Sequence, residues 1–157
     1  MCTREAFVTE ARSWYPTPYH KRGIIKHAGA DCGSYLACVL AECGFLTSDA
    51  LHEMMTRLES LQDDWFMHKA AAIYTETMTR HIPKIGERMT YGLPGEPPGN
   101  IVLMQTGNSK QRNHGGIVTK WPSVIHCIYE GVAEVNVLYD PLWTHKSITV
   151  YDPWSAA

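Results

Sequence analysis

The sequence predicts an α+β domain in which helices come first and an antiparallel sheet follows. Up to about residue 82, apolar residues recur at the spacing of amphipathic helices. After Gly99 the pattern changes to short β-branched or aromatic runs that are separated by turn residues, as in antiparallel strands. Because the strands follow the helices instead of alternating with them, this class is favoured over a parallel α/β sheet.

Composition limits the kinds of protein that this chain can be. Its 157 residues suffice for a core, and we expect a single domain over residues 1–157. Apolar residues make up 45% and charged residues 19%, and a formal net charge of -2 argues against a nucleic-acid binder. No apolar run approaches the roughly 20 residues that cross a bilayer, so we expect no membrane insertion. The first residues lack the basic segment followed by an apolar segment that is typical of a signal peptide, and we expect synthesis in the cytoplasm.

The first half of the chain is predicted to hold three or four helices. They are Arg4–Trp14, about Cys32–Cys43, and a helical insert of one or two helices at about 48–82. Asp31 is placed to cap the second helix, and Gly44 to end it. That helix is apolar nearly all round, so we expect it to be central and buried.

The second half is predicted to form five strands. They are Asn100–Gln105, Gly116–Lys120, Val124–Tyr129, Ala133–Tyr139 and Ser147–Tyr151. Turn signals lie between them at Gly107-Asn108 and at Tyr139-Asp140-Pro141. The segment Pro83–Gly99 holds four prolines and four glycines, and we expect a long loop there with little regular structure.

The chemistry of the chain is concentrated in one cysteine and two histidines. Cys32 opens the second predicted helix, and His114 and His126 follow in strand-like context. A cysteine at a helix start with histidines elsewhere is a common way to build a nucleophilic thiolate. The helix N-terminus and a nearby imidazolium would both lower the pKa of the thiol. Of the five cysteines, only Cys32 has surroundings that indicate reactivity.

Four local patterns occur together in this order along the chain. They are Thr17-Pro18-Tyr19, Asp31-Cys32-Gly33-Ser34, the run Pro98–Leu103, and His114-Gly115-Gly116-Ile117-Val118 with Ile125-His126 after it. This combination resembles the NlpC family of cell-wall cysteine peptidases over about residues 6–130. The spacing of 12 between the histidines (126 minus 114) is familiar in that family. Three positions depart from its usual pattern: the glycine and serine after Cys32 are reversed, Asn100 replaces an aspartate and Gly115 replaces a valine.

The resemblance implies a papain-like fold, with the nucleophile helix packed on a C-terminal antiparallel sheet. It implies hydrolysis of peptidoglycan stem peptides between γ-linked D-glutamate and the following diamino acid, through an acyl-enzyme on Cys32 and without a cofactor or metal. We expect His114 to act as base and then acid, and His126 to fix the orientation and tautomer of its ring. The backbone N–H of Cys32 and the hydroxyl of Tyr19 are the candidate oxyanion donors.

The reversed Gly33-Ser34 pair resembles phage-encoded, tail-associated members of the family. A phage tail or another delivery protein is therefore an expected partner, which would carry the enzyme in a particle or export it by another route.

Three alternatives remain open on the sequence alone. The chain could be a phage tail or wall-binding module without turnover, in which the two histidines are only hydrogen-bonded sheet residues. It could be a papain-like protease or acyltransferase that acts on a protein or a lipid. Sulfur and imidazole also suit zinc, so Cys32, His114 and His126 could form a metal site.

Overall fold

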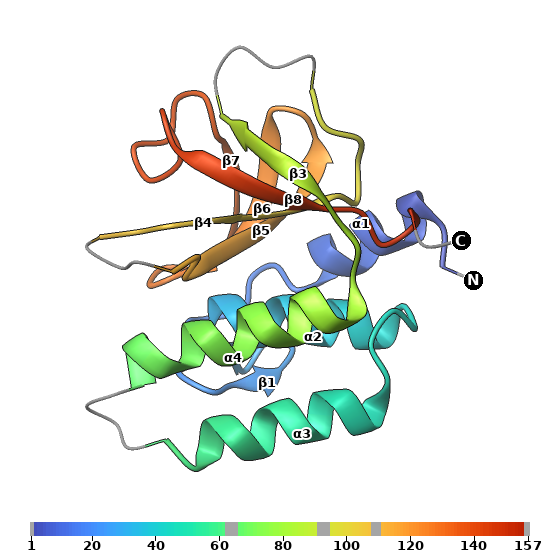
Figure 1. Cartoon of the computed structure of the whole chain (residues 1–157), viewed down its shortest axis with the longest axis vertical. Coiled ribbons are helices and arrows are strands. Elements are labelled where there is room, and N and C mark those ends of the chain that lie inside the picture. Colours follow the sequence, from blue (N-terminus) through green and yellow to red (C-terminus); the bar gives the residue numbers. More distant parts are fainter. Residues whose placement is uncertain (1, 62–65, 91–94, 108–110, 156–157) are drawn as a thin grey trace.

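The computed structural model describes residues 2–61, 66–90, 95–107 and 111–155 and consists of a helical layer beneath an antiparallel sheet (Figure 1). The helices are α1 (Arg4–Ser13), α2 (Cys32–Glu42), α3 (Ser48–Glu59) and α4 (Phe66–His81). The strands of the sheet are β3 (Lys84–Met89), β4 (Ile101–Met104), β5 (His114–Lys120), β6 (Ser123–Ile128), β7 (Gly131–Asn136) and β8 (Ser147–Tyr151). Their spatial order is β3-β8-β4-β5-β6-β7, with every neighbouring pair antiparallel. The predicted α+β class is confirmed.

Helix α2 begins at Cys32 because its N-terminus is capped from both directions. The carboxylate of Asp31 accepts the backbone N–H groups of Gly33 and Ser34, and the Ser34 hydroxyl accepts the N–H of Asp31. This capping box satisfies donors that a helix start otherwise leaves unpaired. The helix packs against β5 and β6, as predicted, so the Cys32 thiol is held at the junction of helix and sheet.

The central strands are apolar on both faces because each face of the sheet covers a separate core. The core on the helix side includes Ile101, Leu103, Ile117 and Ile125. The core on the opposite side consists of Val102, Met104, Val118, Val124, Val137, Trp143, Ile148 and Val150. The side chains alternate between the two cores along each strand, as the pleat of a strand requires. The segment between β7 and β8 folds over the second core and places Trp143 there.

The prediction of an irregular loop over Pro83–Gly99 is wrong in its first part. Residues Lys84–Met89 form strand β3, which lies at the edge of the sheet and pairs with β8. Its side chains are mostly exposed, and Gly86 has a φ of 152° beside a register shift. An exposed edge strand with charges and a glycine lacks the apolar pattern on which the prediction depended.

Other boundaries differ by smaller amounts. Strand β7 spans Gly131–Asn136 and ends before the predicted limit at Tyr139, while the loop before α2 contains a short hairpin of β1 (Ile24–Ile25) and β2 (Gly29–Ala30). The helices α3 and α4 fall inside the predicted insert at 48–82. Of the predicted Gly107-Asn108 turn, Asn108 lies outside the described residues. Over the described part of the chain, no helix has the length and apolar character needed to span a membrane.

The buried amide of Asn100 links the N-terminal helix to the start of β4. Its Oδ1 accepts a hydrogen bond from Arg4 Nη1 (3.0 Å), and its Nδ2 donates to Glu96 Oε2 (3.0 Å). Arg4 continues to Asp152, whose carboxylate accepts two hydrogen bonds from its guanidinium at 2.9 Å. The neutral amide of Asn100 thus lies between the Arg4 guanidinium and the Glu96 carboxylate.

Candidate active site

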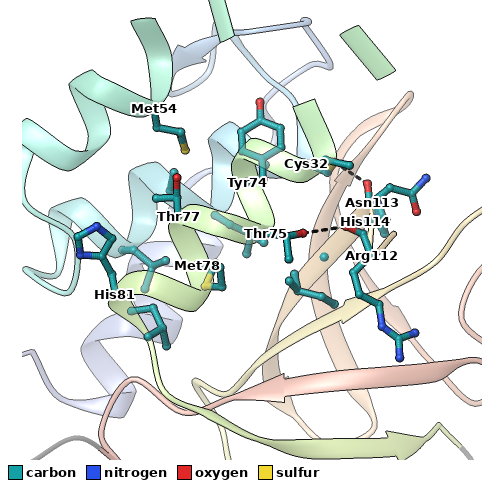
Figure 2. A pocket seen from close by; sticks show the side chains of 18 of the residues that line it. Cys32, Met54, Tyr74, Thr75, Thr77, Met78, His81, Arg112, Asn113 and His114 are labelled. Carbon is teal, nitrogen blue, oxygen red and sulfur yellow. Dashed lines mark hydrogen bonds between the residues drawn. The ribbon is translucent and has the colours of Figure 1, made fainter. Parts of the chain in front are cut away.

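Cys32 lies at the first residue of α2, where two cavities meet its side chain. The larger cavity has a volume of about 330 Å³ and is also lined by Tyr19 and His114. The smaller, of about 30 Å³, lies beneath α4 and has room for little more than a water molecule. Figure 2 shows its lining, with Cys32, Asn113 and His114 at one end and His81 at the other. Cys32 as a residue is partly exposed, and its thiol donates a long hydrogen bond to the Asn113 carbonyl (3.8 Å).

The two histidines that the sequence singles out lie together on neighbouring strands. His114 opens β5, and His126 lies on β6 directly opposite Gly116. The rings are therefore diagonal neighbours on one face of the sheet, and His114 Nε2 lies 2.8 Å from His126 Nδ1. A Cβ on Gly116 would lie 2.4 Å from a methyl carbon of Val124 and 3.2 Å from the Cβ of His126, so glycine leaves room for this arrangement.

Burial favours the uncharged forms of the thiol and both imidazoles. It lowers the pKa of His114 from 6.5 to about 3, with a further contribution from His126, and that of His126 to about 4 against the opposing charge of Asp140. Burial, followed by the charge of Asp31, raises the pKa of the Cys32 thiol well above its usual value. The backbone N–H groups at the helix start lower it, as the sequence predicts, but they are outweighed. These shifts favour a protonated Cys32 thiol and a neutral His114 imidazole on the same cavity.

Tyr74 of α4 forms a wall of the site that the sequence analysis did not predict. Its hydroxyl donates to both carboxylate oxygens of Asp31, at 2.8 and 3.0 Å, and its ring packs against Gly33. Tyr74 lines both cavities together with Cys32. Figure 2 shows its side chain in the wall of the smaller one. Burial, then the charge of Asp31, raises the pKa of its hydroxyl, which stays a neutral donor.

Tyr19 lies on the wall of the larger cavity, as its candidate role requires. Its ring is 4.9 Å from that of Tyr129, which is mostly exposed at the cavity rim. Burial, followed by the charge of Asp31, raises the pKa of the Tyr19 hydroxyl to about 12, so the group remains protonated and able to donate. The structure thus brings Tyr19, Cys32 and His114 to one cavity, with His126 behind His114.

Two further residues of the site were missed by the sequence analysis. The side chain of Asn113 accepts from the backbone N–H of Thr106 and donates to its carbonyl, which links the residue before His114 to Thr106. The fully buried indole of Trp143 places its Nε1 3.2 Å from His126 Nδ1. Neither residue belongs to a recognisable motif, and only the fold brings Trp143 to His126.

No cluster of three or more His, Cys, Asp or Glu side chains is arranged to hold a metal ion within the part of the chain that the structure describes. The imidazoles of His20, His27, His52, His81 and His145 are exposed, while the side chain of His68 lies outside the described residues.

The comparisons with known proteins concern sequence and fold separately. No protein-family model matches the sequence, and no curated protein does so either. The structure is similar to a crystal structure of the NlpC/p60 domain of the peptidoglycan hydrolase SagA, with a TM-score of 0.58. The match covers 94% of this chain and 97% of that one, at 18% sequence identity. The chain therefore has the papain-like fold of NlpC/p60 domains.

Proposed function

We propose that this protein is a cysteine hydrolase that cleaves amide bonds in the stem peptides of peptidoglycan. The observation that carries the proposal is the meeting of Cys32 and His114 on one cavity, with His114 hydrogen-bonded to His126. The likeness to a peptidoglycan hydrolase domain supports the substrate class.

In the first half of the reaction, the Cys32 sulfur attacks the amide carbonyl carbon while His114 takes the thiol proton. General-base assistance is needed because burial holds the thiol in its protonated form. The tetrahedral intermediate then collapses to a thioester, and His114 returns the proton to the departing amine. In the second half, His114 takes a proton from water, the hydroxide attacks the thioester, and a carboxylic acid leaves as Cys32 regains its proton.

The developing oxyanion lies between two kinds of donor in this proposal. The backbone N–H of Cys32 is at the positive end of α2, and Tyr19, which lines the same cavity, supplies a hydroxyl. Donors of this kind are worth on the order of 100-fold in rate each.

The finer assignment concerns the bond that is cut. The volume of about 330 Å³ is in the size range of small-molecule sites and suits a short peptide segment. We assign the scissile bond to the link between γ-D-glutamate and the diamino acid. Delivery by a phage tail or another carrier protein belongs to this proposal.

Digestion of purified cell wall tests the proposal directly. Wild type is expected to release soluble muropeptides, and mass spectrometry of these products identifies the bond that is cut. Cys32→Ala is expected to abolish release. Cys38→Ala is the matched control, because Cys38 lies on the same helix but lines neither of the two cavities at Cys32.

Thermal melting of all three proteins shows whether each variant is folded. Equal release by wild type and a folded Cys32→Ala would refute the role of the thiol. Release of no fragment by folded wild type would refute peptidoglycan hydrolysis.

Two observations favour a second candidate, a wall-binding module without turnover. Burial favours the protonated form of the Cys32 thiol, and Tyr74 of α4 lines both cavities that Cys32 lines. For this candidate, wild type and Cys32→Ala would co-sediment with purified cell wall to the same extent, and neither would release a fragment.

A further inference from the structure

The indole of Trp143 contacts the same nitrogen atom through which the two histidines meet. Trp143 Nε1 is 3.2 Å from His126 Nδ1, and His114 Nε2 is 2.8 Å from that atom. The centroid of the indole lies 5.6 Å from each imidazole centroid, so the three rings form one cluster. Trp143 itself is fully buried in the core on the far side of the sheet, where its position is fixed by packing.

The direction of each hydrogen bond in this cluster follows from the chemistry of the indole. An indole N–H donates and has no lone pair with which to accept. The Nδ1 of His126 must therefore be unprotonated and accept from Trp143. The same unprotonated nitrogen faces His114, so His114 must carry its hydrogen on Nε2. A neutral imidazole has only one such hydrogen, which leaves the Nδ1 of His114 with a free lone pair.

The alternative states of His126 each lose these hydrogen bonds. A half-turn of its ring would place a carbon where Nδ1 lies, and both contacts would be forfeited. An imidazolium would carry a hydrogen on Nδ1, directed at two donors. Burial opposes that charged form and lowers the pKa of His126 to about 4.

This tautomer of His126 leaves a buried N–H group without a partner in the described part of the chain, so the hydrogen bond from the indole is needed to favour it. With Nδ1 as acceptor, neutral His126 carries its hydrogen on Nε2, a buried atom without a hydrogen-bond partner among the described residues. An unpaired buried donor is destabilising, so the other tautomer would compete if only His114 faced the ring. In that tautomer His126 would donate to Nε2 of His114, and the hydrogen of His114 would move to Nδ1.

We infer that Trp143 is a positioning residue, which fixes the tautomers of His126 and His114 so that His114 Nδ1 is the basic nitrogen of the site. The use of that nitrogen as the base for Cys32 rests on the proposed function, whereas the tautomers themselves do not. Trp143 touches neither substrate nor thiol in this role, and its N–H affects the tautomer of His114 through His126.

The tautomers are measurable in the wild-type protein without any substrate. Long-range proton–nitrogen correlation spectra of protein with ¹⁵N-labelled histidine distinguish protonated from unprotonated ring nitrogens. Signals are assigned by their loss in His114→Gln and His126→Asn. We expect both rings to carry hydrogen on Nε2 at pH 7. A protonated Nδ1 in either ring would overturn the inference, whether or not the protein hydrolyses peptidoglycan.

Trp143→Phe tests the role of the indole N–H itself. Phenylalanine keeps an aromatic ring in the core but removes the donor. We expect Nδ1–H signals to appear in both histidines and kcat to fall about tenfold or more with little change in KM. Trp121→Phe is the matched control, since Trp121 packs against the same core and has no ring contact with His114 or His126 among the described interactions.

The outcomes separate the inference from the proposed function. Wild-type tautomers that persist in a folded Trp143→Phe variant would refute the role of the indole. The predicted tautomers in a protein that leaves peptidoglycan intact would uphold the inference and refute the proposed function alone.

Discussion

The ring of Tyr74 in α4 lies directly on the backbone of Gly33, the residue that follows Cys32. A Cβ built on Gly33 would come within 2.2 Å of two ring carbons. The space that a side chain would need is thus filled by the helical insert. Ser34, one position later, supplies the hydroxyl that completes the helix cap. This arrangement gives a physical reason for the reversed glycine and serine after the thiol.

Substitution of Gly33 by Ala is expected to destabilise the protein by about 1–3 kcal/mol, because the new methyl group forces the Tyr74 ring away. Urea unfolding measures this cost. With Tyr74→Ala as background, the same change should be neutral or stabilising, since alanine is otherwise the better helix residue. Additive costs in the double variant would contradict the contact.

Asn100→Asp is expected to destabilise the protein although it restores the residue usual in the resembled family. The new carboxylate would face Glu96 Oε2, to which the amide now donates at 3.0 Å. The lost hydrogen bond and the repulsion should cost about 1–3 kcal/mol at neutral pH by denaturant unfolding. Asp152→Asn is the comparison variant, because it removes the charge of the carboxylate that pairs with Arg4. An Asn100→Asp protein as stable as wild type would contradict this account.

The buried histidines predict a loss of stability in mild acid. Their pKa values fall from 6.5 to about 3 for His114 and about 4 for His126, so below about pH 6.5 the unfolded chain binds protons that the folded chain does not. The stability that they contribute is complete above pH 6.5 and declines as the pH falls toward 4. Each should cost up to about 2 kcal/mol between pH 7 and pH 5.

Denaturant unfolding at the two pH values measures that loss. His126→Asn removes one titrating group and should reduce the loss between pH 7 and pH 5. An unchanged pH dependence in that variant would show that His126 is not held neutral by the fold.

Replacement of His126 is expected to preserve part of the activity only where the new side chain still accepts a hydrogen bond. In His126→Asn the amide oxygen takes the place of Nδ1 and accepts from His114 Nε2, whereas His126→Leu offers no acceptor. We expect kcat to fall on the order of 10²–10⁴-fold for Leu and distinctly less for Asn. Assays of muropeptide release measure both, and equal losses would contradict an acceptor role.

Local patterns sufficed to predict the pieces of the site that lie close in sequence. The Asp31 cap of α2 was predictable because Asp31 acts within one helical turn of Cys32, whereas the reciprocal bond from Ser34 was not predicted. His114 and His126 were predictable as neighbours because the strands that carry them are consecutive, and consecutive antiparallel strands usually pair.

The missed parts depend on contacts between distant segments. Tyr74 reaches Asp31 across 43 residues of chain, and Trp143 reaches His126 across 17 residues that include β7 and the turns after it. Strand β3 was missed because its partner β8 lies at the far end of the sequence and its own side chains have no apolar period. Conformation here is decided by the tertiary partner and not by the local residues.

The link between Arg4 and Asp152 brings the two ends of the chain side by side (Figure 1). The Trp154 indole, which donates to the carbonyl of Cys2 at 3.0 Å, closes the same junction. A short glycine-rich linker could therefore join the ends into a ring, and a new opening after the exposed Ser60 would give a circular permutant with the same sheet. In such a molecule α4 would lead the chain, and the nucleophile helix would follow the strands on which it packs.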